Sequence, residues 1–236
     1  MVQGVNTAGL LVATGGSDAV AAVLSGAASV AEALALLEGP NPVVRTREEL
    51  LLADSRRCVV AGGPGRLPLA EPSPLAPIRG DLEEAGRLIS QVRRADRGEA
   101  PTASALVALL PAKAPATVLV CLGPPRWGVF MRVWPGLPLG PDGGAGEPHR
   151  CPLSILAARL AASGGEERAI TIRGQLDEVE AEVLAEAADA DRLAALMDAA
   201  GDDSGARVRR MLAEAYAIDR ITAALEQLLR GAGPSL

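Results

Sequence analysis

Glycine-rich turns that follow short apolar runs are the residues of this sequence best suited to bind a ligand. Thr14-Gly15-Gly16-Ser17 follows the apolar run Leu10–Ala13, and Gly62-Gly63-Pro64-Gly65 follows Cys58–Ala61. Where a helix begins after such a turn, its unpaired backbone N–H groups can hold a phosphate. The first turn lacks the lysine of a Walker A loop and the full spacing of a dinucleotide fingerprint, and a strand-to-helix turn without any ligand explains it equally well. The residues of this hypothetical anion site are Thr14, Gly15, Gly16, Ser17, Gly62 and Gly63.

One pair of residues suggests nucleophilic chemistry. His149 is the only histidine, and Cys151 lies two positions later, so the two could be a base and a thiol nucleophile. No sequence signature of a cysteine hydrolase surrounds them, and an exposed histidine beside a cysteine at a helix start explains both. The three cysteines have no metal-ligand spacing, which indicates reduced thiols. We therefore assign no catalytic residue, no metal site and no cofactor.

Most of the aromatic residues lie in one short segment. Trp127, Phe130 and Trp134 occur within eight residues, together with Met131. Tryptophan and methionine are enriched at protein interfaces, so this segment could bind a partner. Large rings on a strand more often fill the space between a sheet and a helix, and we expect this role for at least one of the two tryptophans.

The elements that must position these residues alternate between strands and helices. Apolar runs that end in glycine are typical of buried parallel strands, and with capped helices between them they predict an α/β fold with a mostly parallel sheet. We expect the ends of three runs, at Ala13, Ala61 and Leu122, to lie at one edge of this sheet. The predicted strands are 10–13, 42–45, 57–61, 117–122 and 127–134. The predicted helices before residue 173 are 19–38, 46–53, 81–94, 102–110 and 151–162.

The C-terminal part of the sequence predicts a different structure. From Gln175 onward, apolar residues recur every three or four positions in two segments joined by Gly201–Gly205, which indicates an antiparallel helical hairpin. We divide the chain into an α/β body at 1–172, with a possible internal boundary near 95–101, and a hairpin at 173–236. A repeat of similar residues at 78–84 and 172–178 indicates either a duplication or a chance match.

Composition excludes several classes of protein. The chain has 236 residues, of which 49% are apolar, and its net charge is −6. An acidic chain with so few aromatic residues is neither a general nucleic-acid binder nor a base-stacking platform. We expect no membrane span and no signal peptide, and hence a cytoplasmic protein. Residues 173–236 contain 13 acidic residues and 7 arginines, so they carry the whole excess of negative charge.

The sequence therefore predicts a non-catalytic structural or assembly subunit that associates with itself or with another protein. The alternative is a phosphate- or nucleotide-binding protein, or a transferase, that uses the glycine turns. The association hypothesis rests on the width of the apolar faces of the hairpin, which one contact between its two helices cannot cover. The residues predicted to form the interface are Leu193, Met197, Met211, Ile218, Leu225 and Leu229.

Overall fold

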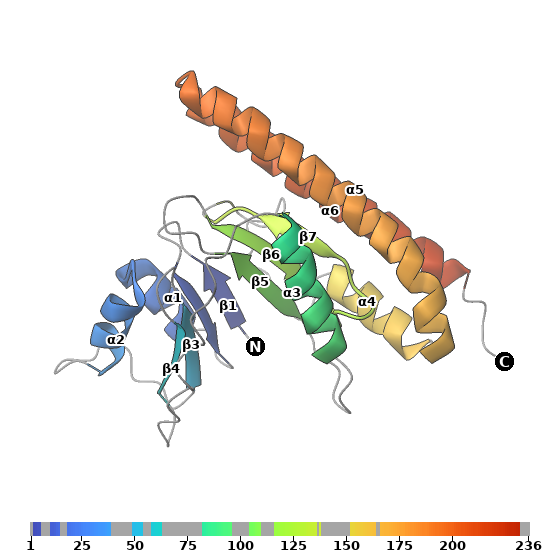
Figure 1. Ribbon diagram of the computed structural model, residues 1–236, viewed down its shortest axis with the longest axis horizontal. Helices are drawn as coiled ribbons and strands as arrows, with labels where there is room; N and C mark the ends of the chain where they lie inside the picture. The colour runs from blue at the N-terminus through green and yellow to red at the C-terminus, as the bar shows by residue number, and fades with distance from the viewer. Residues whose placement is uncertain are drawn as a thin grey trace. The chain divides into compact units, whose positions relative to one another are not determined.

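The fold is described from a computed structural model of the chain (Figure 1). The description covers residues 2–5, 10–14, 18–38, 49–53, 58–62, 82–95, 104–109, 116–135, 137, 152–163 and 166–231. The chain divides into two compact units. The first contains residues 1–85 and 108–118, and the second contains residues 86–107 and 119–236.

The first unit contains a four-stranded sheet and two short helices. Its elements are β1 (Val2–Val5), β2 (Leu11–Thr14), α1 (Asp18–Gly26), α2 (Val30–Glu38), β3 (Glu49–Ala53) and β4 (Cys58–Gly62). The strands lie in the order β1-β2-β3-β4, and each is antiparallel to its neighbours. Val12 and Leu52 are paired in register and are both fully buried. They form a core with apolar residues of α1 and α2, including Val23 and Val30.

A capping interaction separates α1 from α2. The hydroxyl of Ser29 accepts a hydrogen bond from the backbone N–H of Glu32, at 3.3 Å. The carboxylate of Glu32 in turn accepts one from the backbone N–H of Ala28, at 2.9 Å. This arrangement is similar to a capping box, except that the carboxylate binds the N–H of the residue before the N-cap, and it starts a new helix. The single helix predicted at 19–38 is therefore two helices.

The second unit is built from a small sheet and four helices. Its elements are α3 (Leu82–Ala95), β5 (Ala105–Leu109), β6 (Thr117–Cys121), β7 (Phe130–Val133), α4 (Pro152–Ala162), α5 (Glu166–Ala199) and α6 (Asp203–Arg230). The first residues of α3, the end of β5 and the start of β6 are counted with the first unit. The three strands form an antiparallel sheet in the order β5-β6-β7, so β7 is an edge strand.

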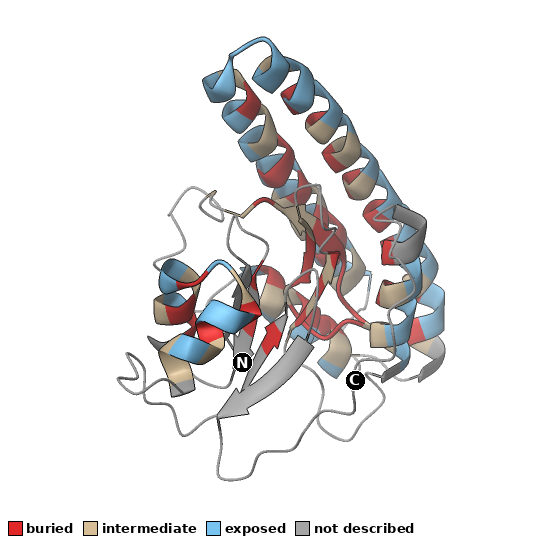
Figure 2. Ribbon diagram, turned by 60° about the vertical axis from the view of Figure 1, so that its left-hand side comes forward, coloured by how far each residue is buried: buried red, intermediate tan, exposed pale blue. Residues whose placement is uncertain are grey.

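The longest elements, α5 and α6, form the predicted antiparallel hairpin (Figure 1). Gly201 in the connection has a φ of +79°, a conformation that favours glycine. Asp202 caps α6, because its side chain accepts a hydrogen bond from the backbone N–H of Gly205 at 2.9 Å. In Figure 2, buried residues face the space between the two helices and exposed residues line their outer sides.

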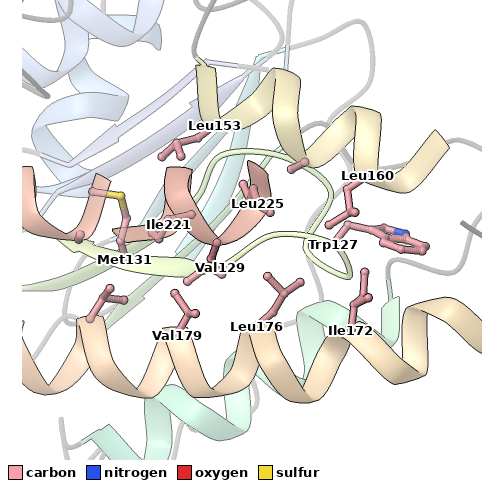
Figure 3. Packing of buried hydrophobic residues seen from close by; sticks show 14 of the residues in the cluster. Trp127, Val129, Met131, Leu153, Leu160, Ile172, Leu176, Val179, Ile221 and Leu225 are labelled. Atoms are coloured by element: carbon pink, nitrogen blue, oxygen red, sulfur yellow. The ribbon is translucent and has the colours of Figure 1, made fainter. Parts of the chain in front are cut away.

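The hairpin is part of the main core of the second unit. Ile172, Leu176 and Val179 of α5 lie opposite residues of α4, α6 and the segment between β6 and β7 (Figure 3). Their buried partners include Trp127, Val129, Met131, Leu153, Leu160, Ile221 and Leu225. Because these side chains fill one core, the inner faces of the hairpin are covered by the rest of the same unit.

The predicted mostly parallel sheet is wrong. The first sheet is antiparallel throughout, the second is a small antiparallel sheet, and most of the described residues are helical. The runs that end at Ala13 and Ala61 form β2 and β4, which point the same way on either side of β3. The run that ends at Leu122 forms β6, in the other sheet, so the three runs do not share one sheet.

Two predicted helices are also wrong. Residues 49–53, inside the helix predicted at 46–53, form the central strand β3. Residues 105–109, inside the helix predicted at 102–110, form β5, in which buried and half-buried residues alternate. Strand β6, the helices α3 and α4 and the strand within 127–134 are confirmed. The predicted strand at 42–45 lies outside the described residues.

The hairpin begins earlier than predicted. Helix α5 starts at Glu166 and runs without a break through residues 172–178, so the second copy of the suggested repeat is the interior of a helix. The division of the chain near residue 173 stays a prediction.

Candidate functional site

The hairpin has two buried glutamates, and one of them connects it to the edge strand β7. Glu180 of α5 is 7% exposed, and its Oε2 accepts a hydrogen bond from the backbone N–H of Phe130 at 2.7 Å. Glu214 of α6 is 3% exposed and is the other buried acidic residue among the described residues. An edge strand presents unpaired backbone groups. Glu180 therefore satisfies one of them with a carboxylate instead of a further strand.

Glu180 is paired with an arginine. The Nη2 of Arg93, on α3, lies 2.5 Å from Glu180 Oε2, and its guanidinium lies 5.6 Å from the centre of the Phe130 ring. The Nε of Arg93 also donates to the backbone oxygen of Pro125 at 3.2 Å. A buried carboxylate with an arginine partner and a backbone donor keeps its negative charge at low cost.

A second arginine extends this network. The Nη1 of Arg173 donates to the backbone oxygen of Gly128 at 2.9 Å, and its Nε donates to Asp177 at 2.8 Å. Asp177 also lies 3.4 Å from Arg93. Burial, and then the nearby charge of Arg93, lower the pKa of Arg173 below its ordinary value. Two arginines and two carboxylates thus hold α3, α5 and the segment before β7 together.

Glu214 lies in a different environment from Glu180. It directly follows Ala213, which is buried with Trp134, Ala187 and Ala190 in a small apolar cluster. Its Oε1 has no hydrogen-bond partner among the described residues. Burial raises the pKa of Glu214 to about 7, although the hydrogen bond from Trp134 opposes this shift.

The indole of Trp134 is fixed by a charged pair. Its Nε1 donates to Asp191 Oδ1 on α5 at 2.6 Å. The Nε of Arg132 lies 2.9 Å from the other carboxylate oxygen of Asp191. The two groups form an ion pair, but this contact does not have the geometry of a hydrogen bond. The Arg132 guanidinium lies 5.4 Å from the centre of the Trp134 ring. Both tryptophans, Phe130 and Met131 are buried, so the core role predicted for at least one of the two tryptophans is confirmed.

The outer face of α6 carries a row of exposed apolar side chains. Val208, Leu212 and Tyr216 are separated by four residues each, so they lie along one side of the helix. Their exposed fractions are 54%, 59% and 40%. We call these three residues the outer α6 stripe. Solvated helix faces are normally polar, and an apolar patch with a polar rim is typical of a protein interaction site.

The charges beside this stripe are paired within the hairpin. Arg209 of α6 lies 2.6 Å from Glu186 of α5, and Arg220 lies 2.8 Å from Glu182. The hydroxyl of Tyr216 also donates to Glu182, and this bond is the main cause of the lowered pKa of the Glu182 carboxyl. Arg209 and Arg220 therefore already have carboxylate partners beside the stripe.

The six residues predicted to form the interface lie in different surroundings. Leu193 and Met211 are exposed, and Met197 is half-buried near the end of α5. Ile218 and Leu229 pack against the main core, and Leu225 is buried within it.

Only part of the predicted anion site is described. Thr14 ends β2 and pairs with Leu50, whereas Gly62 ends β4 and pairs with Glu49. The two strand ends thus lie on either side of the start of β3, two strand spacings or about 10 Å apart. Gly15, Gly16, Ser17 and Gly63 lie outside the described residues, as do His149 and Cys151.

The two buried glutamates and the outer α6 stripe were not predicted from the sequence. Glu180 had a detectable signal, because it lies four residues after Leu176 and three before Val183, inside the apolar spacing of α5. An acidic residue at such a position must find a partner in the core.

Comparison of the chain with family models, curated proteins and solved structures gave no match. None of the described helices is both long and apolar enough to cross a membrane. The described residues contain no group of three or more histidine, cysteine, aspartate or glutamate side chains placed to hold a metal ion.

Proposed function

We propose that the protein is a non-catalytic assembly subunit in which two copies associate through the outer α6 stripe. The observation that carries this proposal is the exposure of Val208, Leu212 and Tyr216 on a helix whose inner face is already covered. Burial of such side chains against a partner removes apolar surface from water and stabilises the complex.

Charge favours a second copy that contacts α6 rather than α5. Helix α5 contains ten acidic residues and three arginines, so two α5 helices in contact would repel each other. Helix α6 contains four acidic residues and five arginines and is nearly neutral. Contact between two α6 helices therefore brings together mixed charges, and Arg209, Arg210 and Arg220 are already paired with residues of α5.

The stripe is also self-complementary. In an antiparallel pair of α6 helices related by a twofold axis at Leu212, this residue faces its own copy and Val208 faces Tyr216. The large tyrosine ring then lies opposite the smaller valine, as in a packed interface.

The experiment is light scattering on the full-length protein and two variants. Leu212→Glu places a charge at the centre of the stripe, whereas Gln227→Glu adds the same charge at an exposed position of α6 outside it. We expect a dimer for the wild type and Gln227→Glu, and a folded monomer for Leu212→Glu. A monomeric wild type, or a dimer that Leu212→Glu leaves intact, contradicts the proposal. Removal of the whole hairpin is unsuitable, because α5 and α6 contribute to the main core.

A phosphate or nucleotide site in the first unit is the second candidate. It is supported by the parallel course of β2 and β4, which end at Thr14 and Gly62 on either side of β3. Thermal unfolding with added phosphate or nucleotide tests this candidate: a stabilisation that Gly16→Leu abolishes supports it, and no stabilisation rules it out. The composition also supports a cytoplasmic location, which we include in the proposal.

A further inference from the structure

We propose that Glu182 of α5 is a positioning residue for the association of two copies, because it holds the ring of Tyr216 in place within the outer α6 stripe. The inference rests on the proposed function and adds to it, since it makes a residue of α5 control the affinity of a surface that α6 presents. It follows from the contacts that cross the hairpin beside the stripe.

The two carboxylate oxygens of Glu182 bind two different residues of α6. Its Oε1 accepts a hydrogen bond from the hydroxyl of Tyr216, and its Oε2 accepts one from the Nε of Arg220 at 2.8 Å. Tyr216 and Arg220 are four residues apart, so they lie on one face of the helix. The charged arginine therefore fixes the carboxylate, and the carboxylate fixes the phenol ring.

Tyr216 is the residue of the stripe for which this anchoring matters most. The branched side chain of Val208 has few rotamers, whereas an exposed tyrosine ring turns about two side-chain torsions. The bond to Glu182 ties the far end of this ring to α5 before any partner binds. A side chain that is already ordered loses less conformational entropy when it packs against Val208 of the second copy.

A neighbouring ion pair provides a matched control. Glu186 lies four residues after Glu182 on α5, and its Oε1 lies 2.6 Å from the Nη2 of Arg209 on α6. Both pairs cross the hairpin, and both glutamate side chains are partly exposed. The partner of Glu186 is not a stripe residue, so its removal breaks a similar ion pair without freeing the tyrosine ring.

The first test is the dissociation constant of the dimer, measured by analytical ultracentrifugation on the full-length protein and its variants. We expect Glu182→Ala to raise this constant roughly 3- to 10-fold relative to Glu186→Ala, because the ring must then be ordered on association. Glu182→Gln retains an oxygen that accepts from the hydroxyl, so it should keep most of the affinity. In a Tyr216→Phe background, Glu182→Ala should have no further effect.

The second test measures the anchoring itself, without any association. Tyr216 is the only tyrosine, so the ultraviolet absorbance of tyrosinate reports its ionisation alone. The hydrogen bond to Glu182 is the main cause that raises the pKa of Tyr216, with a smaller effect of Glu186 in the same direction and an opposing one of Arg220. In a Leu212→Glu background, Glu182→Ala should therefore lower this pKa, and Glu186→Ala should lower it less.

The outcomes separate this inference from the proposed function. A monomeric wild type, or a dimer that Leu212→Glu leaves intact, overturns the association and the positioning role with it. A dimer that Leu212→Glu abolishes, but that Glu182→Ala and Glu186→Ala weaken equally, overturns only the positioning role. The same holds if the titration of Tyr216 is unchanged in Glu182→Ala, because the ring is then not held by that carboxylate.

Discussion

At the scale of single residues, the hairpin depends on polar anchors placed inside apolar faces. Glu180 and Glu214 lie on the buried faces of α5 and α6, where most of the other buried residues are leucine, isoleucine, valine and alanine. Helix spacing alone does not reveal a backbone donor on another element, so the partner of Glu180 could not be predicted from the sequence. The partner of Glu180 is Phe130, fifty residues earlier, and such contacts become visible only in the fold.

The pair of Glu180 and Arg93 gives a direct prediction at this scale. Glu180→Leu leaves the guanidinium of Arg93 without its closest partner and the N–H of Phe130 without an acceptor. We expect a loss of about 3–5 kcal/mol in the free energy of unfolding. The double variant with Arg93→Met should recover part of that loss, because it removes the unpaired charge. Urea denaturation of the four proteins measures the coupling, and strictly additive losses would show that the two residues do not interact.

At the scale of elements, the predicted segments are correct where local signals and packing agree. The spacing of apolar residues predicts both helices of the hairpin, because one face of each is buried in a core. Glu49–Ala53 is rich in leucine, a strong helix former, but hydrogen bonding to β2 and β4 on both sides makes it a strand. Apolar runs before glycine turns occur in antiparallel as well as parallel sheets, so strand direction could not be read from them.

Two glycines give opposite predictions for the same substitution. Gly174 lies inside α5 with open space around the position of a Cβ atom, so Gly174→Ala should stabilise the protein by about 0.5–1 kcal/mol. Gly123 has a φ of +136°, and a Cβ atom there would lie 2.5 Å from the Cβ of Ala157 on α4. Gly123→Ala should therefore destabilise it by roughly 1–3 kcal/mol. Thermal unfolding distinguishes the two, and midpoints that shift in the same direction would contradict this description of the backbone.

At the scale of the whole molecule, the two helices of the hairpin differ in charge. The acidic excess lies on α5, whereas α6 is nearly neutral and carries the outer α6 stripe. The sequence analysis found the net charge of the hairpin but treated its two helices as one region. It also required a second surface to cover the apolar faces, and the structure shows that α4 and the segment around β7 cover most of the inner ones.

Disulfide cross-linking at position 212 tests the proposed association most directly. In a background with Cys58, Cys121 and Cys151 replaced by alanine, Leu212→Cys places a thiol where two antiparallel α6 helices meet, and Gln227→Cys places one outside that contact. Under mild oxidation, we predict that Leu212→Cys forms a covalent dimer much faster than Gln227→Cys, as seen on a non-reducing gel. Equal rates for the two variants, or no covalent dimer of Leu212→Cys at a concentration where the protein is folded, would contradict the account.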